Sequence, residues 1–287
     1  MEVVERVYSG VDVAVQHGLY EFLRRDFGVE VVSTPATKGL PFVDSPTPTV
    51  LSASLYLVVI VGGLLWITVG DLKPRAKEPG WLQALVLVHN LFCFALSLYM
   101  CVGIIYQAIV HGYSVWGNAY YPHHREMASL IYLFYMSKFV EFMDTIIMVL
   151  KRSTRQITFL HVYHHASISV IWWAIAHEVP GGDVYFSAAL NAGVHVFMYG
   201  YYFLAALLRS KPKLRAKYLF WGRYLTQFQM FQFMLNLIHA YIIIKMKMPM
   251  PQYLVKTEFY YMISLLCLFG NFYFRKYIKS SKGDKIE

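Results

Sequence analysis

Three histidines lie close together in one short apolar segment of the chain. His161, His164 and His165 occur between Phe159 and Trp173, in the run FLHVYHHASISVIWW. Their spacing of i, i+3 and i+4 places the three imidazoles on one face of a helix. Histidine in a segment able to cross a membrane is costly and usually faces a bundle interior or a water-filled cavity. One such residue can be satisfied by hydrogen bonds between helices, but three on one face indicate a functional site.

Two kinds of chemistry suit such a cluster, since no Gly-x-Ser-x-Gly motif or neighbouring thiol accompanies it. The imidazoles can bind a metal ion, or they can act as base and nucleophile. Imidazole is both a fair nucleophile and a fair leaving group toward an activated acyl group because its pKa lies near neutrality. The side chains available to a metal suffice for one mononuclear site at most: His161, His164, His165, His195, Asp144 and Glu141.

The composition indicates an integral membrane protein. Of the 287 residues, 57% are hydrophobic and only 15% are charged, below the roughly 25% charged residues of a soluble domain. The net charge of +9 does not point to nucleic acid, because the basic residues lie in short runs between apolar segments, as membrane topology requires. Cys93, Cys101 and Cys267 lie inside apolar segments and form neither a disulfide framework nor a zinc site.

Seven apolar segments have about the 20 residues that a bilayer crossing needs, so we predict an all-α protein with seven transmembrane helices. Residues 1–48 form a predicted extramembrane lead without a signal peptide, residues 49–275 the membrane domain, and residues 276–287 a basic tail. The predicted spans are 49–69, 82–109, 127–149, 157–176, 184–207, 218–244 and 257–275.

The charges of the connections alternate along the chain. Sixteen Lys and Arg residues follow the first, third, fifth and seventh spans, among them Lys151, Arg152, Arg155 and those of the run 209–217. The positive-inside rule therefore predicts a lumenal N-terminus and a cytosolic C-terminus. The histidines of the fourth span then lie near the cytosolic side.

Three other spans carry polar side chains at helical spacing. Lys138, Glu141 and Asp144 recur at every third position of the third span, where opposite charges partly neutralise each other. A purely structural ion-pair ladder is the alternative explanation. Stripes on the fifth and sixth spans comprise Asn191, His195, Tyr199 and Tyr202, and Gln229, Gln232, Asn236 and His239. We expect the stripes to converge on an enclosed polar chamber.

Four motifs together resemble the ELO family, the membrane condensing enzymes of fatty-acid elongation. They occur in the family's order and spacing from about residue 50 to 275: Lys138-x-x-Glu141-x-x-Asp144-Thr145, His161-x-x-His164-His165, Asn191-x-x-x-His195-x-x-Met198-Tyr199 and Thr226-Gln227-Phe-Gln229. The residue sequences at 72–75 and 220–226 resemble those of plant-type elongases that act on polyunsaturated C18 acyl chains.

The resemblance implies six helices in two inverted three-helix units around a closed-ended acyl tunnel, with the first span peripheral. It implies that His164 takes the acyl group from CoA, with His195 facing it. Malonyl-CoA then loses CO2 and attacks the acyl-imidazole, giving a 3-ketoacyl-CoA. Four residues would orient and polarise the pair: His161, His165, Asn191 and Asp144, with Glu141 also in the catalytic set. No metal or cofactor is required.

We expect basic and polar side chains to bind the anionic CoA substrates: Lys138, Lys151, Arg152, Arg155, Gln156, Tyr199, Gln229 and Arg223. Expected partners are the bilayer, a second copy of the chain, and the ketoacyl reductase, dehydratase and enoyl reductase of the elongation cycle. The resemblance implies endoplasmic-reticulum residence, although the C-terminus lacks a complete dilysine signal. Two alternatives remain open, a histidine-box desaturase or oxygenase and a seven-span receptor or transporter.

Overall fold

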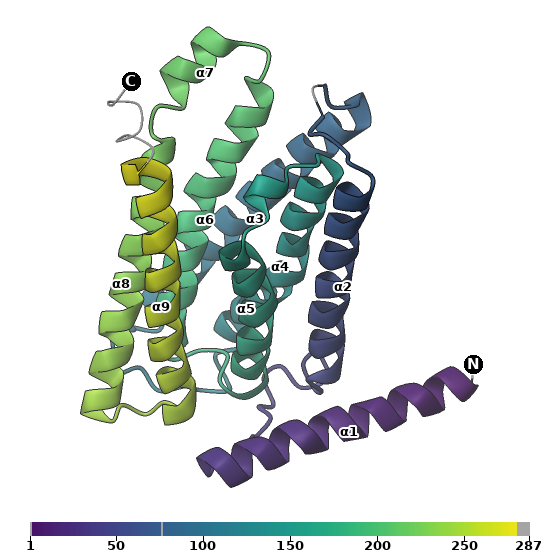
Figure 1. Ribbon diagram of the computed structural model, residues 1–287. Coiled ribbons are helices and arrows are strands. Elements are labelled where there is room, and N and C mark those ends of the chain that lie inside the picture. The colour runs from purple at the N-terminus through teal and green to yellow at the C-terminus, as the bar shows by residue number, and fades with distance from the viewer. Residues whose placement is uncertain (1, 76, 280–287) are drawn as a thin grey trace.

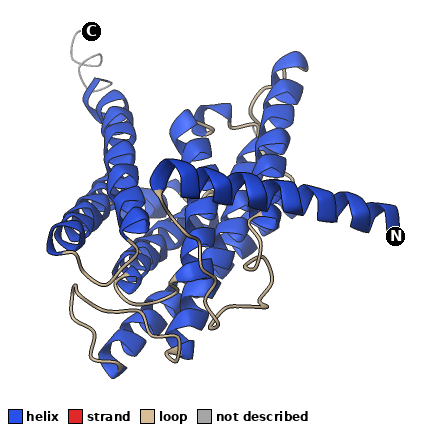
Figure 2. Ribbon diagram, turned by 90° about the horizontal axis from the view of Figure 1, so that it is seen from below, coloured by secondary structure: helices blue, strands red, loops and turns tan. Residues whose placement is uncertain are grey.

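The computed structural model describes residues 2–75 and 77–279, and over these residues it is helical with no strand (Figures 1 and 2). The all-α class is therefore confirmed. The α-helices are α1 (Glu2–Phe27), α2 (Thr47–Val69), α3 (Gly80–Val110), α4 (Arg125–Leu150), α5 (Phe159–Glu178), α6 (Val184–Leu207), α7 (Pro212–Tyr218), α8 (Gly222–Met246) and α9 (Gln252–Tyr273). A short 3-10 turn, Thr154–Gln156, precedes α5, and a π-helical turn, Phe274–Lys279, follows α9.

Seven of these helices, α2 to α6, α8 and α9, correspond to the seven predicted spans. Over the described residues, only α2 and α3 are long and apolar enough to meet a length-and-composition criterion for crossing a membrane. The others contain charged residues, histidines or tyrosines that lower their hydropathy. The number of membrane crossings therefore stays a prediction.

Six helices pack in a closed ring. Each of α3, α4, α5, α9, α8 and α6 contacts the next, and α6 contacts α3 to complete the ring. Following the chain, α3, α4 and α5 go around the ring in one direction, whereas α6, α8 and α9 go around it in the other. Helix α2 packs on the outside of this ring against α4 and α5.

The basic connections gather at one end of the bundle, at the top of Figure 1, which we call the basic end: residues 70–75, 77–79, 151–158, 208–221 and 274–279. Glu78 joins two of these connections by ion pairs with Lys151 and Arg209. Lys282 and Lys285 of the predicted tail lie outside the described residues. The alternation of connections expected from the charges is thus present, because successive helices return to the same end.

The N-terminal lead contains a helix that the spacing analysis did not anticipate. Helix α1 lies across the opposite end of the bundle, and its N-terminal part projects beyond it (Figures 1 and 2). The chain after α1 then enters the core, where Val43 is 1% exposed. The Val43 carbonyl accepts hydrogen bonds from Trp173 Nε1 at 3.0 Å and His177 Nδ1 at 2.9 Å. The lead is therefore anchored to α5 by backbone groups that need buried partners.

Candidate functional site

The three histidines follow directly on the N-terminus of α5. The Thr158 side chain caps this helix by accepting a hydrogen bond from the His161 backbone N–H at 3.3 Å, which fixes where the helix begins. The ring centroids of His161 and His165 are 4.5 Å apart, and those of His164 and His165 are 5.5 Å apart. The predicted shared face is therefore present.

His161 is oriented by two neighbouring helices. Its Nε2 lies 2.8 Å from the Thr145 Oγ1 of α4. Thr145 Oγ1 is in turn 2.9 Å from the Tyr56 hydroxyl of α2. Helix α2 is peripheral to the ring, yet it contributes a side chain to the network that holds the histidines. No pattern in the sequence singled out Tyr56.

The charged stripe of α4 meets the polar stripe of α6. Lys138 Nζ donates to Glu141 Oε1 at 2.7 Å, and both residues are at most 3% exposed. The same ammonium donates to Asn191 Oδ1 at 3.3 Å, and His195 Nδ1 lies 3.5 Å from Glu141 Oε1. These four predicted residues therefore form one cluster, in which the ion pair offsets the cost of burying two charges.

Asp144 belongs to a separate pair of contacts. Its Oδ1 is 2.7 Å from His89 Nε2, and its Oδ2 accepts a 2.7 Å hydrogen bond from the Tyr199 hydroxyl. Sequence reasoning missed His89. The available signal was the polar pair His89-Asn90 in the otherwise apolar segment 82–109.

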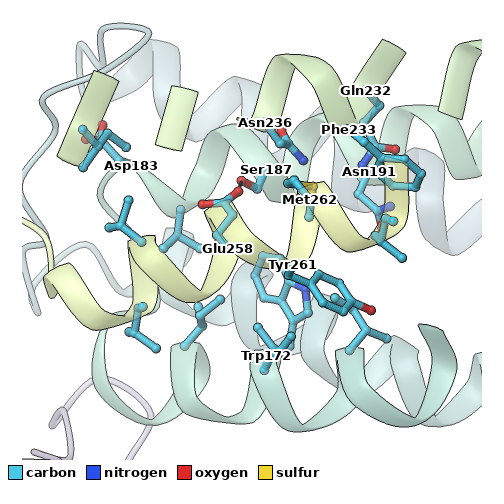
Figure 3. Close-up of a pocket in the computed structure, with 18 of the residues that line it drawn as sticks. Trp172, Asp183, Ser187, Asn191, Gln232, Phe233, Asn236, Glu258, Tyr261 and Met262 are labelled. Carbon is cyan, nitrogen blue, oxygen red and sulfur yellow. Dashed lines mark hydrogen bonds between the residues drawn. The ribbon is translucent and has the colours of Figure 1, made fainter. Parts of the chain in front are cut away.

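His164 differs from the other two histidines because it lines a cavity. The cavity lies between α5, α6, α8 and α9, and Figure 3 shows its labelled lining residues. Nδ1 of His164 is 3.1 Å from the Tyr261 hydroxyl of α9. Tyr261 was not among the predicted site residues, because nothing in the sequence shows that α9 packs against the histidine face of α5.

The cavity is mostly apolar, with polar groups at intervals. Ile168, Trp172 and Leu265 represent its apolar lining. Ser187 Oγ donates to Glu258 Oε1 across it, and the two side chains point toward each other in Figure 3. The polar lining also includes Asp183, Asn191, Gln232 and Asn236. An apolar lining with a few polar groups is typical of sites that bind small molecules.

Four buried polar atoms of this region have no hydrogen-bond partner among the described residues: Glu141 Oε2, His165 Nδ1, Gln232 Oε1 and Asn236 Oδ1. Buried polar groups are usually hydrogen-bonded. Their positions mark where a substrate group or a water molecule can bind.

The other predicted substrate-binding residues do not join this cluster. Lys151 pairs with Glu78 at 3.2 Å, and Arg152 lies over the Trp66 ring at 5.6 Å. Arg155 and Gln156 are exposed at the basic end. The remaining two have local partners, Gln229 with Met198 and Arg223 with Tyr224. Within the described part of the chain, none of these six lines the cavity or bonds to a histidine.

Within 2–75 and 77–279, no group of three or more His, Cys, Asp or Glu side chains is placed to hold a metal ion. His161 and His164 each contact a hydroxyl group, and His195 contacts a carboxylate.

The family model and the similar known proteins indicate the same family. A model of the ELO family, described as the GNS1/SUR4 family, matches residues 41–285. Fatty acid elongase 6 of Leishmania major is 43% identical over 249 residues, covering 84% of this chain and 62% of that protein, so the chain spans less than two thirds of this relative. Very long chain fatty acid elongase 5 of Xenopus tropicalis is 34% identical over 256 residues, covering 88% of this chain and 83% of the relative. The human protein of the same name is 34% identical over 249 residues, covering 84% and 78%. Because the family model matches residues 41–285 and these relatives are 34–43% identical, the chain belongs to the ELO family.

Proposed function

We propose that the protein condenses a long-chain acyl-CoA, of the polyunsaturated C18 class, with malonyl-CoA to give a 3-ketoacyl-CoA two carbons longer. This makes it an acyltransferase that needs no metal or cofactor. The observation that carries the proposal is the position of His164, whose imidazole lines a largely apolar cavity beside the buried polar cluster. An acyl chain in this cavity buries apolar surface and brings its thioester to the imidazole.

The proposed reaction has two covalent steps. A His164 nitrogen attacks the thioester carbon, the carbon–sulfur bond breaks, and CoA leaves as the thiolate. Malonyl-CoA then loses CO2, and the resulting carbanion attacks the acyl carbon and breaks its bond to nitrogen. Lys138 and Asn191 supply positive charge and an amide at the cluster beside the cavity, where negative charge develops.

The proposed setting is the endoplasmic-reticulum membrane. Seven helices cross the bilayer, the six-helix ring encloses the acyl cavity, the N-terminus is lumenal and the C-terminus cytosolic. The exposed cations of the basic end, such as Arg155, attract the phosphates of CoA. The product passes to a ketoacyl reductase, a dehydratase and an enoyl reductase, and a second copy of the chain is a candidate partner.

Purified protein incubated with malonyl-CoA and C16 to C20 acyl-CoAs tests this function. Wild type should release CO2 and 3-ketoacyl-CoA, and His164→Ala should not, while still folding. With acyl-CoA alone, mass spectrometry should find the acyl group on the peptide containing His164. The matched control is His17→Ala, on the exposed surface of α1, which should keep full activity.

Two results would contradict the proposal. Turnover by His164→Ala within tenfold of wild type would remove the covalent role of this histidine. Loss of activity on chelation, with recovery on adding iron, would instead favour the histidine-box oxygenase.

A further inference from the structure

A chain of hydroxyl groups connects His164 to the backbone of its own helix. Nδ1 of His164 is 3.1 Å from Tyr261 Oη, and Tyr261 Oη is 3.0 Å from Ser167 Oγ. Ser167 Oγ donates to the Tyr163 carbonyl at 2.6 Å. Among the described residues, Nε2 of His164 has no hydrogen-bond partner, and the residue lines the cavity.

The directions of these hydrogen bonds follow from the carbonyl at the end of the chain. A carbonyl oxygen only accepts, so the Ser167 proton is used in its 2.6 Å bond. With its own proton used, Ser167 Oγ can only accept in its 3.0 Å hydrogen bond with Tyr261, so the Tyr261 hydroxyl donates to Ser167. The Tyr261 oxygen is left to accept a proton from His164 Nδ1.

We propose that Tyr261 and Ser167 are positioning residues that hold His164 in the tautomer with its proton on Nδ1. The lone pair of Nε2 is then free to attack the acyl thioester. This inference rests on the proposed function, in which His164 is the nucleophile. A group that fixes which nitrogen carries the proton decides which nitrogen reacts.

The hydrogen-bonded chain from His164 Nδ1 through Tyr261 and Ser167 to the Tyr163 carbonyl, which we call the relay, also determines the charge of the intermediate. When Nε2 forms its bond to the acyl carbon and the thiolate leaves, the Nδ1 proton has no acceptor beyond Tyr261, because the relay ends on a carbonyl. The intermediate is therefore an acyl-imidazolium cation, paired in charge with the departing thiolate. The carbanion formed on loss of CO2 takes the acyl group, the electron pair returns to Nε2, and CoA thiolate takes a proton from solvent. The Nδ1 proton stays in place throughout.

Two substitutions separate this role from packing. Tyr261→Phe keeps the ring but removes the acceptor for Nδ1–H. Ser167→Ala leaves the Tyr261 proton free to turn toward Nδ1, which favours the unproductive tautomer. We expect each to slow single-turnover acylation by about tenfold, the effect of losing one neutral hydrogen bond, with little change in KM. Ser167→Thr, which keeps the hydroxyl, should restore the rate.

The structure supplies a matched control for each variant. Tyr253→Phe removes a hydroxyl that bridges the same two helices by donating to Glu178 Oε1, without a bond to His164, Tyr261 or Ser167. Ser169→Ala removes the same kind of bond to the helix backbone, at 3.0 Å from the Ala166 carbonyl. Both controls should keep the wild-type acylation rate.

The tautomer itself can be measured independently of activity. Nitrogen-15 NMR of labelled protein, with the His164 signal assigned by comparison with His164→Ala, should show a protonated Nδ1 in wild type and a shift toward protonated Nε2 in Ser167→Ala. An unchanged tautomer in both variants, or acylation rates equal to wild type, would overturn the inference. If wild type condenses its substrates, either of these results contradicts only the role of Tyr261 and Ser167. If wild type is inactive, the proposed function itself is contradicted.

Discussion

The Asp144 carboxylate of α4 lies 2.7 Å from His89 Nε2 of α3. Its second oxygen is occupied by the Tyr199 hydroxyl of α6, so the carboxylate joins three helices and has no oxygen left over from these contacts. Asp144 therefore acts on the site through the position of its neighbours.

Replacing Asp144 by Asn should destabilise the protein by about 1.5–3 kcal/mol, the usual worth of a hydrogen bond to a charged group. The asparagine amide replaces one carboxylate oxygen by an NH2 group, which would face an N–H or O–H donor of His89 or Tyr199. Thermal unfolding measures the loss, and condensation activity should fall with it. Asp71→Asn is the control, because Asp71 is exposed and pairs only with Lys73 at 2.7 Å. Unchanged stability of Asp144→Asn would show that the bridge contributes nothing.

Arg155 should contribute more to CoA binding than its two basic neighbours. Lys151 is neutralised by Glu78, and Arg152 lies over Trp66, whereas Arg155 is exposed at the basic end. Arg155→Gln should raise KM for both CoA substrates by about two- to fivefold at low ionic strength, and less at high salt. Arg125→Gln, at the opposite end of α4, should change neither value. Equal KM values in Arg155→Gln and wild type at low salt would assign phosphate binding to the run 211–217.

The amides in the cavity should affect the choice of acyl chain. Gln232 Oε1 and Asn236 Oδ1 have no partner among the described residues, and a saturated chain offers them none. The more acidic C–H groups at and between double bonds can donate weak C–H···O contacts to these oxygens, each worth about 0.5–1 kcal/mol. Asn236→Leu should therefore raise the turnover of saturated relative to polyunsaturated C18 acyl-CoA by about two- to fivefold. Ile243→Leu, an apolar change on the same helix, is the control. A constant ratio would indicate that water occupies these amides.

The histidines at the end opposite the basic end should make stability depend on pH. The His124 ring stacks on the His111 ring with their centroids 3.7 Å apart, and its centroid lies 4.6 Å from that of His123. Burial, followed by the charges of these two neighbours, lowers the pKa of His124, against a smaller opposing effect of Glu126. The unfolded chain thus binds this proton more readily, so stability is lost as pH falls below about 6.5.

Thermal unfolding at pH 7.5 and 5.5 measures this loss. In His124→Gln the difference between the two melting temperatures should be smaller than in wild type, and in His17→Gln, on exposed α1, it should be unchanged. Tyr113, whose hydroxyl lies 3.1 Å from His124 Nδ1, stays neutral over this range because burial raises its pKa. An equal difference in all three proteins would exclude His124 as its source.

Relationships within one helix were predictable from the sequence. The spacing of His161, His164 and His165 fixes their common face, and the interval between Lys138 and Glu141 is one at which side chains meet. Contacts between helices were not predictable in this way. That His89 reaches Asp144, or Tyr261 reaches His164, depends on how α3 and α9 are rotated, and rotation is set by packing along the whole helix.

Helix α1 was missed for a different reason. A span is recognised by an apolar run long enough to cross a bilayer, whereas α1 mixes charged residues with Val7, Val11 and Val15. Its existence follows from spacing that such a search does not test. The seven other long helices were predictable because apolar residues outnumber polar residues in each of them.

The burial of Val43 against α5 has a consequence for biosynthesis. Residues 34–43 take their hydrogen bonds from groups near residues 120, 135 and 173–177, so the lead emerges from the ribosome long before its binding site exists. Contacts between residues so distant in sequence form late and slowly. The backbone groups of the lead therefore stay hydrated until α5 has been synthesised and packed. Docking of the lead is expected to be the last folding step at this end of the bundle.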